Sequence, residues 1–142
     1  MAIISDPVWS EEWLAAFPEA HPLARRTDLH ATDFDGQVII GHAERSPRCG
    51  RHVLDLLDTL HVTVRIVAEA EHLQTELTLV QSGMGIAFVP GALANISIDG
   101  IAFRPFTPTR GRIVVHAAWP DGTTTGLVAQ FLRVAHAVIS AG

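Results

Sequence analysis

The sequence contains no lysine, and its ten basic residues are all arginines. These arginines are scattered along the chain, and fifteen acidic residues give a net charge of −5. A nucleic-acid-binding surface needs clustered basic side chains to contact phosphates, so this composition argues against that function. The lack of lysine also argues against a phosphate-binding loop that ends in a lysine.

The sequence has little cysteine and no long apolar run. The single cysteine, Cys49, cannot form a disulfide within the chain and is typical of a reducing compartment. Residues 1–7 lack the basic start of a signal peptide. No apolar stretch approaches the roughly 20 residues that span a bilayer. We therefore expect a cytoplasmic protein with no membrane contact.

Strand and helix patterns alternate along the 142 residues, of which 48% are hydrophobic. This content predicts a folded chain of one domain or two small lobes. The expected strands and helices are, in order, strands 11–17 and 37–40, helix 46–60, strand 62–67, helix 71–82, strands 86–89, 98–104 and 112–119, and helix 125–139. This alternation predicts an α/β fold with a mainly parallel sheet.

Residues 71–90 carry the most specific pattern. Leu73, Leu77 and Val80 share one face at helical spacing. Gly83 is suited to end this helix, because glycine adopts the left-handed conformation easily. Gly85 then allows the chain to reverse into a buried strand, which Pro90 ends.

The other two predicted helices also have recognisable faces. Ser46 and Pro47 form a favourable start for the first, which should bury Val53, Leu57 and Leu60. In the last helix, four apolar residues at helical spacing are expected to be buried. These are Leu127, Phe131, Val134 and Val138.

The passage 71–90 resembles the segment of helix, glycines, strand and proline in the effector-binding domain of LysR-type transcriptional regulators. Residues 15–24 and 27–34 resemble the strand, His-Pro-Leu-Ala passage and turn found midway through that domain, and residues 126–138 resemble its closing helix. The resemblance implies a periplasmic-binding-protein-like fold of type 2. It also implies a module that senses a small molecule, without catalysis and without a cofactor.

The resemblance assigns parts of the chain to two lobes. Residues 1–31 correspond to a crossover strand and a remnant of the first lobe, residues 32–97 to the second lobe, and residues 98–142 to the return strands and closing helix of the first. The winged helix-turn-helix and the opening part of the first lobe have no counterpart. This implies a truncated homo-oligomeric regulator, with DNA contacted only through a missing N-terminal domain. Such a lobe should leave apolar surface uncovered.

In this family the effector sits between the lobes, with its polar groups at helix N-termini, where free N–H groups and the helix dipole favour anions. The resemblance therefore implies a small anionic metabolite as the partner. Arg48 could pair with its carboxylate, Ser46 and Thr75 could donate hydrogen bonds, and Phe88 could line the pocket wall. The full set of expected contacts is Gly41, His42, Ser46, Arg48, His72, Thr75 and Phe88.

Simpler roles remain open for several of these residues. Ser46 is also a plain helix cap, Arg48 a solvated surface group, and Phe88 a core residue. His42, Cys49 and His52 invite a metal interpretation. Only Cys49 and His52 share a helix face, however, and no second ligand pair is present, so we expect no metal site.

Other functions find weaker support. Residues 81–85 follow a helix and precede a strand, whereas phosphate-binding and dinucleotide-binding loops follow a strand and open a helix. Glu69 and Glu71 share a strand face but have no recognisable acid–base partner, so an enzyme is the least favoured class. The alternatives kept are a stand-alone solute-binding protein, which the lack of a signal peptide opposes, and an oligomerisation module that pairs through an exposed strand edge.

Overall fold

The computed structural model describes residues 2–42, 51–108, 113–122 and 126–141. Ser46, Arg48 and Cys49 lie outside these residues, and of His42 only the backbone is described. The chain divides into two compact units. We call residues 12–112 the sheet unit and residues 1–11 with 113–142 the ribbon unit.

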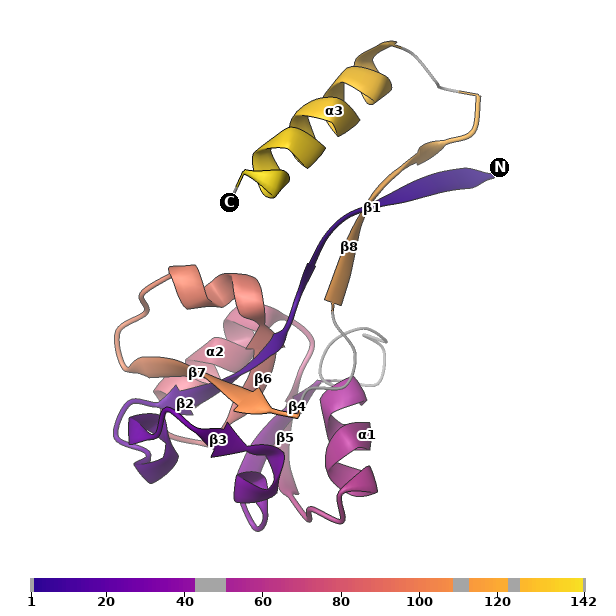
Figure 1. Ribbon diagram of the computed structural model, residues 1–142. Coiled ribbons are helices and arrows are strands. Elements are labelled where there is room, and N and C mark those ends of the chain that lie inside the picture. Colours follow the sequence, from indigo (N-terminus) through magenta and orange to yellow (C-terminus); the bar gives the residue numbers. More distant parts are fainter. Residues whose placement is uncertain (1, 43–50, 109–112, 123–125, 142) are drawn as a thin grey trace. The chain divides into compact units, whose positions relative to one another are not determined.

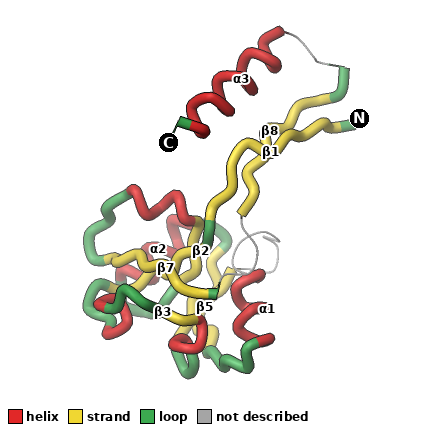
Figure 2. The backbone as a smooth tube through the Cα atoms, viewed as in Figure 1, coloured by secondary structure: helices red, strands yellow, loops and turns green. Residues whose placement is uncertain are grey.

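The sheet unit contains six strands and two α-helices within its described part (Figures 1 and 2). The strands are β2 (Trp13–Pro18), β3 (Leu29–His30), β4 (Val38–His42), β5 (Arg65–Ala70), β6 (Ala87–Pro90) and β7 (Ile101–Thr107). The α-helices are α1 (Arg51–Thr59) and α2 (Leu73–Gln81). Three short 3-10 helices, η1 (Pro22–Arg25), η2 (Ala31–Phe34) and η3 (Gly91–Asn95), follow β2, β3 and β6.

The strands of this unit form one continuous mixed sheet. Four of them pair in the order β3-β7-β2-β6, and β4 pairs with β5. The two groups meet where Ile39 and Ile86 form a parallel bridge, in which Ile86 N donates to Val38 O at 2.9 Å. Because only β2 runs antiparallel to its neighbours, the other five strands share one direction. The predicted α/β class with a mainly parallel sheet is therefore confirmed.

Side chains alternate between the two faces of this sheet. On the face toward α2, the sheet residues Leu14, Ala16, Ile40, Ala87 and Val89 form a buried cluster with Val80 of α2. Leu73 and Leu77 of α2 pack against this cluster, as their spacing predicted. The opposite face carries an aromatic cluster, in which Phe34 contacts three other phenylalanine rings at centroid distances of 5.1–6.1 Å. These are Phe17, Phe88 and Phe106.

The sequence patterns predicted most helices and strands of the sheet unit, although some begin or end at other residues than expected. Gly83 ends α2 with φ of +85°, as expected. Strand β5 begins at Arg65 and not at residue 62, because the preceding residues form an irregular segment that bonds to the loop before β4. Gly36 N donates to Thr63 O at 2.7 Å, and Thr63 N donates to the Asp35 carboxylate at 2.8 Å.

The ribbon unit consists of two long strands and one helix. Strand β1 (Ile3–Glu11), which the sequence did not predict, pairs antiparallel with β8 (Ile113–Pro120). The register shifts between Pro7 and Trp9, where proline offers no N–H. Helix α3 (Gly126–Ser140) follows β8 in this unit (Figure 1). His136 Nε2 of α3 approaches the Asp6 carboxylate of β1 at 3.0 Å.

The predicted burial of α3 is wrong. The four residues expected in a core are exposed by 57–75%. These are Leu127, Phe131, Val134 and Val138. Indeed, no described residue of the ribbon unit is fully buried. Helical spacing identifies an apolar face, but whether anything covers that face depends on segments distant in sequence, and a two-stranded ribbon is too narrow to cover it.

The compact units divide the chain at 11/12 and 112/113, whereas the sequence suggested divisions at 31/32 and 97/98. The observed division keeps β7, β2 and β6 in one unit, since β2 pairs with both β7 and β6 in one sheet. The assignment of segments to a first and a second lobe stays a prediction. No helix in the described ranges is long and apolar enough to cross a membrane.

Candidate functional site

The five parallel strands of the sheet unit end on the same edge, which we call the carboxyl edge. The last residues of these strands are His30, His42, Ala70, Pro90 and Thr107. In open α/β sheets, ligands bind outside the carboxyl ends of the strands. The carboxyl edge is therefore the part of this unit where the fold itself favours a binding site.

Gly41 lies where β4 and β5 approach closely. It pairs with Glu69 in the parallel ladder. A Cβ atom at this position would lie 3.1 Å from Ile66 Cγ2 and 3.7 Å from Ala68 O. The glycine thus accommodates the neighbouring strand, and the only polar groups it can offer a ligand are those of its backbone.

Helix α2 begins immediately after β5 and presents its N-terminus beside the carboxyl edge. His72 is the N-cap residue, with an extended backbone, and its side chain makes no capping hydrogen bond. The side chains of His72 and Thr75 are both exposed. Because the first N–H groups of a helix have no partner within it, this terminus can accept an anion. The fold thus brings two expected contacts together with the ends of β4 and β5.

The acidic residues near this terminus differ in how strongly they oppose a bound anion. Glu69 and Glu71 are exposed next to it and disfavour a bound anion. Glu76, in the first turn of α2, is only 2% exposed, and this burial raises its pKa to about 8. Glu76 is therefore mostly protonated at neutral pH and adds little negative charge. Net attraction for an anion requires a cation, and Arg48, the expected one, lies outside the described residues.

Phe88 does not belong to an open pocket wall. Its ring is 3% exposed and packs against Phe34 and Phe106 at centroid distances of 5.1 and 5.5 Å. Its neighbours Ala87 and Val89 face α2, so Phe88 points to the other side of the sheet. The interpretation of Phe88 as a core residue, which the sequence left open, is the one that its burial supports.

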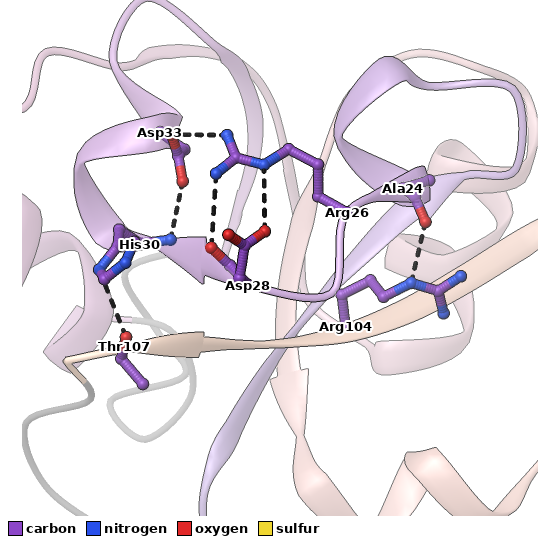
Figure 3. A network of polar contacts seen from close by, with 7 residues as sticks. All are labelled: Ala24, Arg26, Asp28, His30, Asp33, Arg104 and Thr107. Carbon is purple, nitrogen blue, oxygen red and sulfur yellow. Dashed lines mark hydrogen bonds and ion pairs between the residues drawn. The ribbon is translucent and has the colours of Figure 1, made fainter.

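A polar network at the carboxyl ends of β3 and β7 escaped the sequence analysis (Figure 3). The Asp33 carboxylate accepts hydrogen bonds from His30 N at 2.7 Å and from Arg26 Nη1 at 2.9 Å. These contacts, the His30 N–H first, hold the pKa of Asp33 below its usual value. His30 Nδ1 lies 3.5 Å from the Thr107 hydroxyl. The sequence signal that could have revealed this network is the spacing of His30 and Asp33, because an acidic residue three positions after a helix cap is typical of a capping box.

Two cavities within the described part of the sheet unit lie away from the candidate residues. The larger, of about 560 Å³, is lined by Glu19, Ala24, Arg25, residues 94–98 and residues 101–104. A second, of about 290 Å³, lies between α2 and residues 98–101. Neither is lined by Gly41, His72 or Thr75. Within the described part of the chain, no three His, Cys, Asp or Glu side chains gather to hold a metal ion.

The LysR substrate binding domain family matches residues 2–140. The chain belongs to this family. The LysR-type resemblance of residues 71–90 is therefore confirmed.

One curated relative is the HTH-type transcriptional regulator TtuA of Agrobacterium vitis, which is 29% identical over 109 residues. These residues make up 73% of the chain but 36% of TtuA, so the chain corresponds to a limited part of that regulator.

Solved structures of LysR effector-binding domains share the fold. The regulatory domain of CcmR from Synechocystis PCC6803, in complex with 2-PG, has a TM-score of 0.78 and 18% identity, over 96% of this chain and 66% of that one. The BenM effector binding domain with its effector benzoate has a TM-score of 0.72 and 18% identity, over 99% of this chain and 64% of that one. The fold is thus periplasmic-binding-protein-like, of type 2.

Proposed function

We propose that this chain is the effector-sensing module of a LysR-type transcriptional regulator, that it binds a small anionic metabolite at the carboxyl edge of the sheet unit, and that it catalyses no reaction. The observation that carries the proposal is the N-terminus of α2, which lies beside the parallel ends of β4 and β5 with His72 and Thr75 exposed. Benzoate, the effector of BenM, is itself a small carboxylate.

Each expected contact has a distinct role in this proposal. The first N–H groups of α2 and the hydroxyl of Thr75 donate hydrogen bonds to the carboxylate. Arg48 supplies the positive charge that offsets Glu69 and Glu71, and the hydroxyl of Ser46 donates a further hydrogen bond, both as the family resemblance implies. Gly41 contributes its backbone, and the imidazole of His72 contacts the remaining polar groups of the ligand. His42 is kept as a contact because the family resemblance implies it.

The effector acts by changing the populations of alternative arrangements of the regulator. A ligand that binds one arrangement of the regulator better than another changes the balance between them by its difference in affinity. We place this event in a cytoplasmic homo-oligomer. DNA contacts are assigned to another part of such a regulator, because the whole match to the family lies within its substrate-binding domain.

A titration monitored by NMR tests the site. Benzoate, 2-PG and a panel of other small mono- and dicarboxylates are added separately to the 15N-labelled full chain. For a ligand that binds, we expect the largest amide shifts at residues 41–42 and 70–76, where strand ends and helix N-terminus converge. No shift in these residues with any ligand of the panel would overturn the proposal.

A pair of matched variants tests the role of the hydroxyl. Thr75→Val removes one hydrogen-bond donor without changing the shape of the side chain, and we expect binding about tenfold weaker. Thr78→Val is the control, since Thr78 is exposed one turn later on α2 and its hydroxyl already donates to Gln74 O at 2.8 Å. Equal affinities of the two variants would contradict the role of Thr75.

A further inference from the structure

A cavity lies where β2 ends and β7 begins, at the edge of the sheet opposite the carboxyl edge, and we call it the amino-edge cavity. Its volume of about 560 Å³ falls within the roughly 300–1,000 Å³ of typical small-molecule sites. Four segments line it: the turn after β2, η1, residues 94–98 and the start of β7. All four belong to the sheet unit, so the cavity is formed within one compact unit.

The cavity exists because β3 covers only the last part of β7. In the described part of the chain, β3 pairs with Phe106 and Thr107, whereas β7 begins at Ile101. Beside the uncovered part of β7, η1 supplies the wall, and Ala24 O accepts a hydrogen bond from Arg104 Nε at 2.8 Å (Figure 3). This arrangement leaves residues 101–104 of an edge strand next to a cavity.

The guanidinium of Arg104 is held in place but keeps free donors. Its Nε donates to Ala24 O and its Nη1 donates to Phe103 O, both at 2.8 Å. Arginine has five N–H donors, and no group in the described ranges accepts a hydrogen bond from Nη2 of Arg104. A half-buried guanidinium that is already oriented is suited to bind a carboxylate.

Charges of both signs line this cavity without neutralising one another. Glu19 and Arg25 are exposed, and neither has an ion-pair partner among the residues the structure describes. Together with Arg104 they give the lining one negative and two positive formal charges. A plain anion is repelled by Glu19, whereas a ligand that carries both signs has an attractive contact with each.

The positions of Glu19 and Arg104 fit a small zwitterion. Glu19 N donates to Gly100 O at 2.9 Å, so Glu19 lies beside a residue four positions before Arg104. At a strand rise of about 3.3 Å per residue, the two backbones are about 13 Å apart. Both side chains line the cavity and shorten this gap, yet they form no ion pair. A small molecule with two opposite charges fits between them.

We propose that the amino-edge cavity binds a small amino acid with an apolar side chain. The carboxylate of the ligand accepts hydrogen bonds from Arg104 Nη2 and is attracted by Arg25, while its ammonium group donates to the Glu19 carboxylate. The apolar side chain covers Ile96, which is 52% exposed and lines the cavity. This site does not rest on effector binding at the carboxyl edge, because none of its residues belongs to that edge.

An NMR titration of the 15N-labelled full chain with L-leucine tests the proposal. We expect a dissociation constant of about 1 mM for so small a ligand, and therefore titrate to about 20 mM. Amide shifts should appear at residue 19, residues 24–25 and residues 95–104. No shift there overturns the proposal, and shifts confined to residues 41–42 and 70–76 overturn it as well. The carboxylate titration of the carboxyl edge is independent, because it is read from those other residues.

Two matched ligands test the need for both charges. 4-Methylpentanoate is leucine without its ammonium group, and 3-methylbutylamine is leucine without its carboxylate. The first should bind at least about threefold weaker than L-leucine, and the second at least about tenfold weaker, since it brings a cation to two arginines. Equal binding of 4-methylpentanoate and L-leucine would exclude an amino acid site and overturn the proposal.

Glu19→Gln tests the role of the carboxylate at an exposed position. It should weaken binding of L-leucine about three- to fivefold, but strengthen binding of 4-methylpentanoate, because it removes a repulsion. A merely structural role of Glu19 would change both affinities in the same direction. Glu71→Gln is the control, since Glu71 is exposed and does not line the cavity. Unchanged affinity of Glu19→Gln for L-leucine would contradict the proposal.

Arg104→Lys tests the guanidinium. Lysine keeps the charge but cannot offer donors on Nη2 while it bonds to Ala24 O, so L-leucine and 4-methylpentanoate should both bind at least about threefold weaker. Arg65→Lys is the control, because Arg65 is exposed on β5. Binding by Arg104→Lys that equals wild type would remove Arg104 from the site and overturn the proposal.

Discussion

Among the residues the structure describes, Glu76 is the one ionisable side chain that is buried. It shares a face of α2 with Leu73, Leu77 and Val80, the three apolar residues that form the helical pattern of the sequence. Burial disfavours the charged carboxylate and raises its pKa from 4.5 to about 8. The residue therefore links the stability of the sheet unit to pH.

The sign of this link follows from proton binding. Between pH 4.5 and about 8 the folded chain holds a proton on Glu76 that the unfolded chain releases, so the free energy of unfolding falls as pH rises through this range. Glu76→Gln should remove this slope and unfold at higher urea concentration than wild type at pH 8.5. Urea titrations of both chains at pH 5.5, 7 and 8.5 measure how the free energy of unfolding changes with pH.

The control for this experiment is Glu71→Gln, because Glu71 is exposed just before α2. It should keep the wild-type pH dependence. If the free energy of unfolding of Glu76→Gln depends on pH as strongly as that of wild type, the pH dependence must come from other groups.

A second prediction concerns Asp33, whose carboxylate joins Arg26 to the backbone of His30 (Figure 3). Asp33→Ala should lower the free energy of unfolding by about 1 kcal/mol, since it removes a helix-capping acceptor. Asp28→Ala should have a much smaller effect, because Asp28 is exposed and its contact with Arg26 is 3.6 Å long. Thermal unfolding of the two variants compares them, and equal midpoints would contradict the capping role.

At the scale of elements, the parallel bridge between Ile39 and Ile86 joins the two parts of the sheet. Gly85 precedes this bridge and lies close to Val38 of β4. A Cβ atom at Gly85 would lie 2.9 Å from Val38 O and 3.2 Å from Val38 Cγ1. The glycine is therefore required for close approach of two backbones, and not only for the chain reversal that its position after Gly83 suggested.

Gly85→Ala should force β4 away from β6 and lower the free energy of unfolding by about 1–3 kcal/mol. Gly126→Ala is the matched control, because no atom lies within 4 Å of a Cβ at that position. Alanine in place of Gly126 should be neutral or slightly stabilising at the start of α3. Chemical denaturation of both variants tests the pair. An unchanged Gly85→Ala chain would show that the strands can separate at no cost.

At the scale of the whole molecule, the two units differ in how much they bury. The sheet unit contains all of the buried core residues described, from Trp13 to Phe106. The ribbon unit has none, and β1 and β8 pair only with each other. Two-stranded structures without a core are marginally stable in water. The ribbon unit should therefore open far more often than the sheet unit.

Native-state hydrogen exchange measures this difference. Amides of β1 and β8 should exchange at least about 100-fold faster than those of β2 and β6, because opening of the ribbon breaks few buried contacts. Equal protection of β1 and β2 in the monomer would contradict the difference in stability.

The sequence by itself determined the family, the α/β class and most elements of the sheet unit. These conclusions depend on residues close together along the chain. The spacing of Leu73, Leu77 and Val80 defines a helix face, and Gly83 ends the helix with positive φ. The same local pattern placed His72 and Thr75 at a helix start, which the structure shows beside two strand ends.

Only the tertiary structure decided which faces are covered. Phe88 and Phe131 are both aromatic residues in regular elements, yet one is 3% exposed and the other 62%. Burial of Phe88 depends on Phe34 and Phe106, which lie 54 residues before it and 18 residues after it in the sequence. Periodicity reports on neighbours three or four residues apart, whereas burial depends on segments that meet only when the chain has folded.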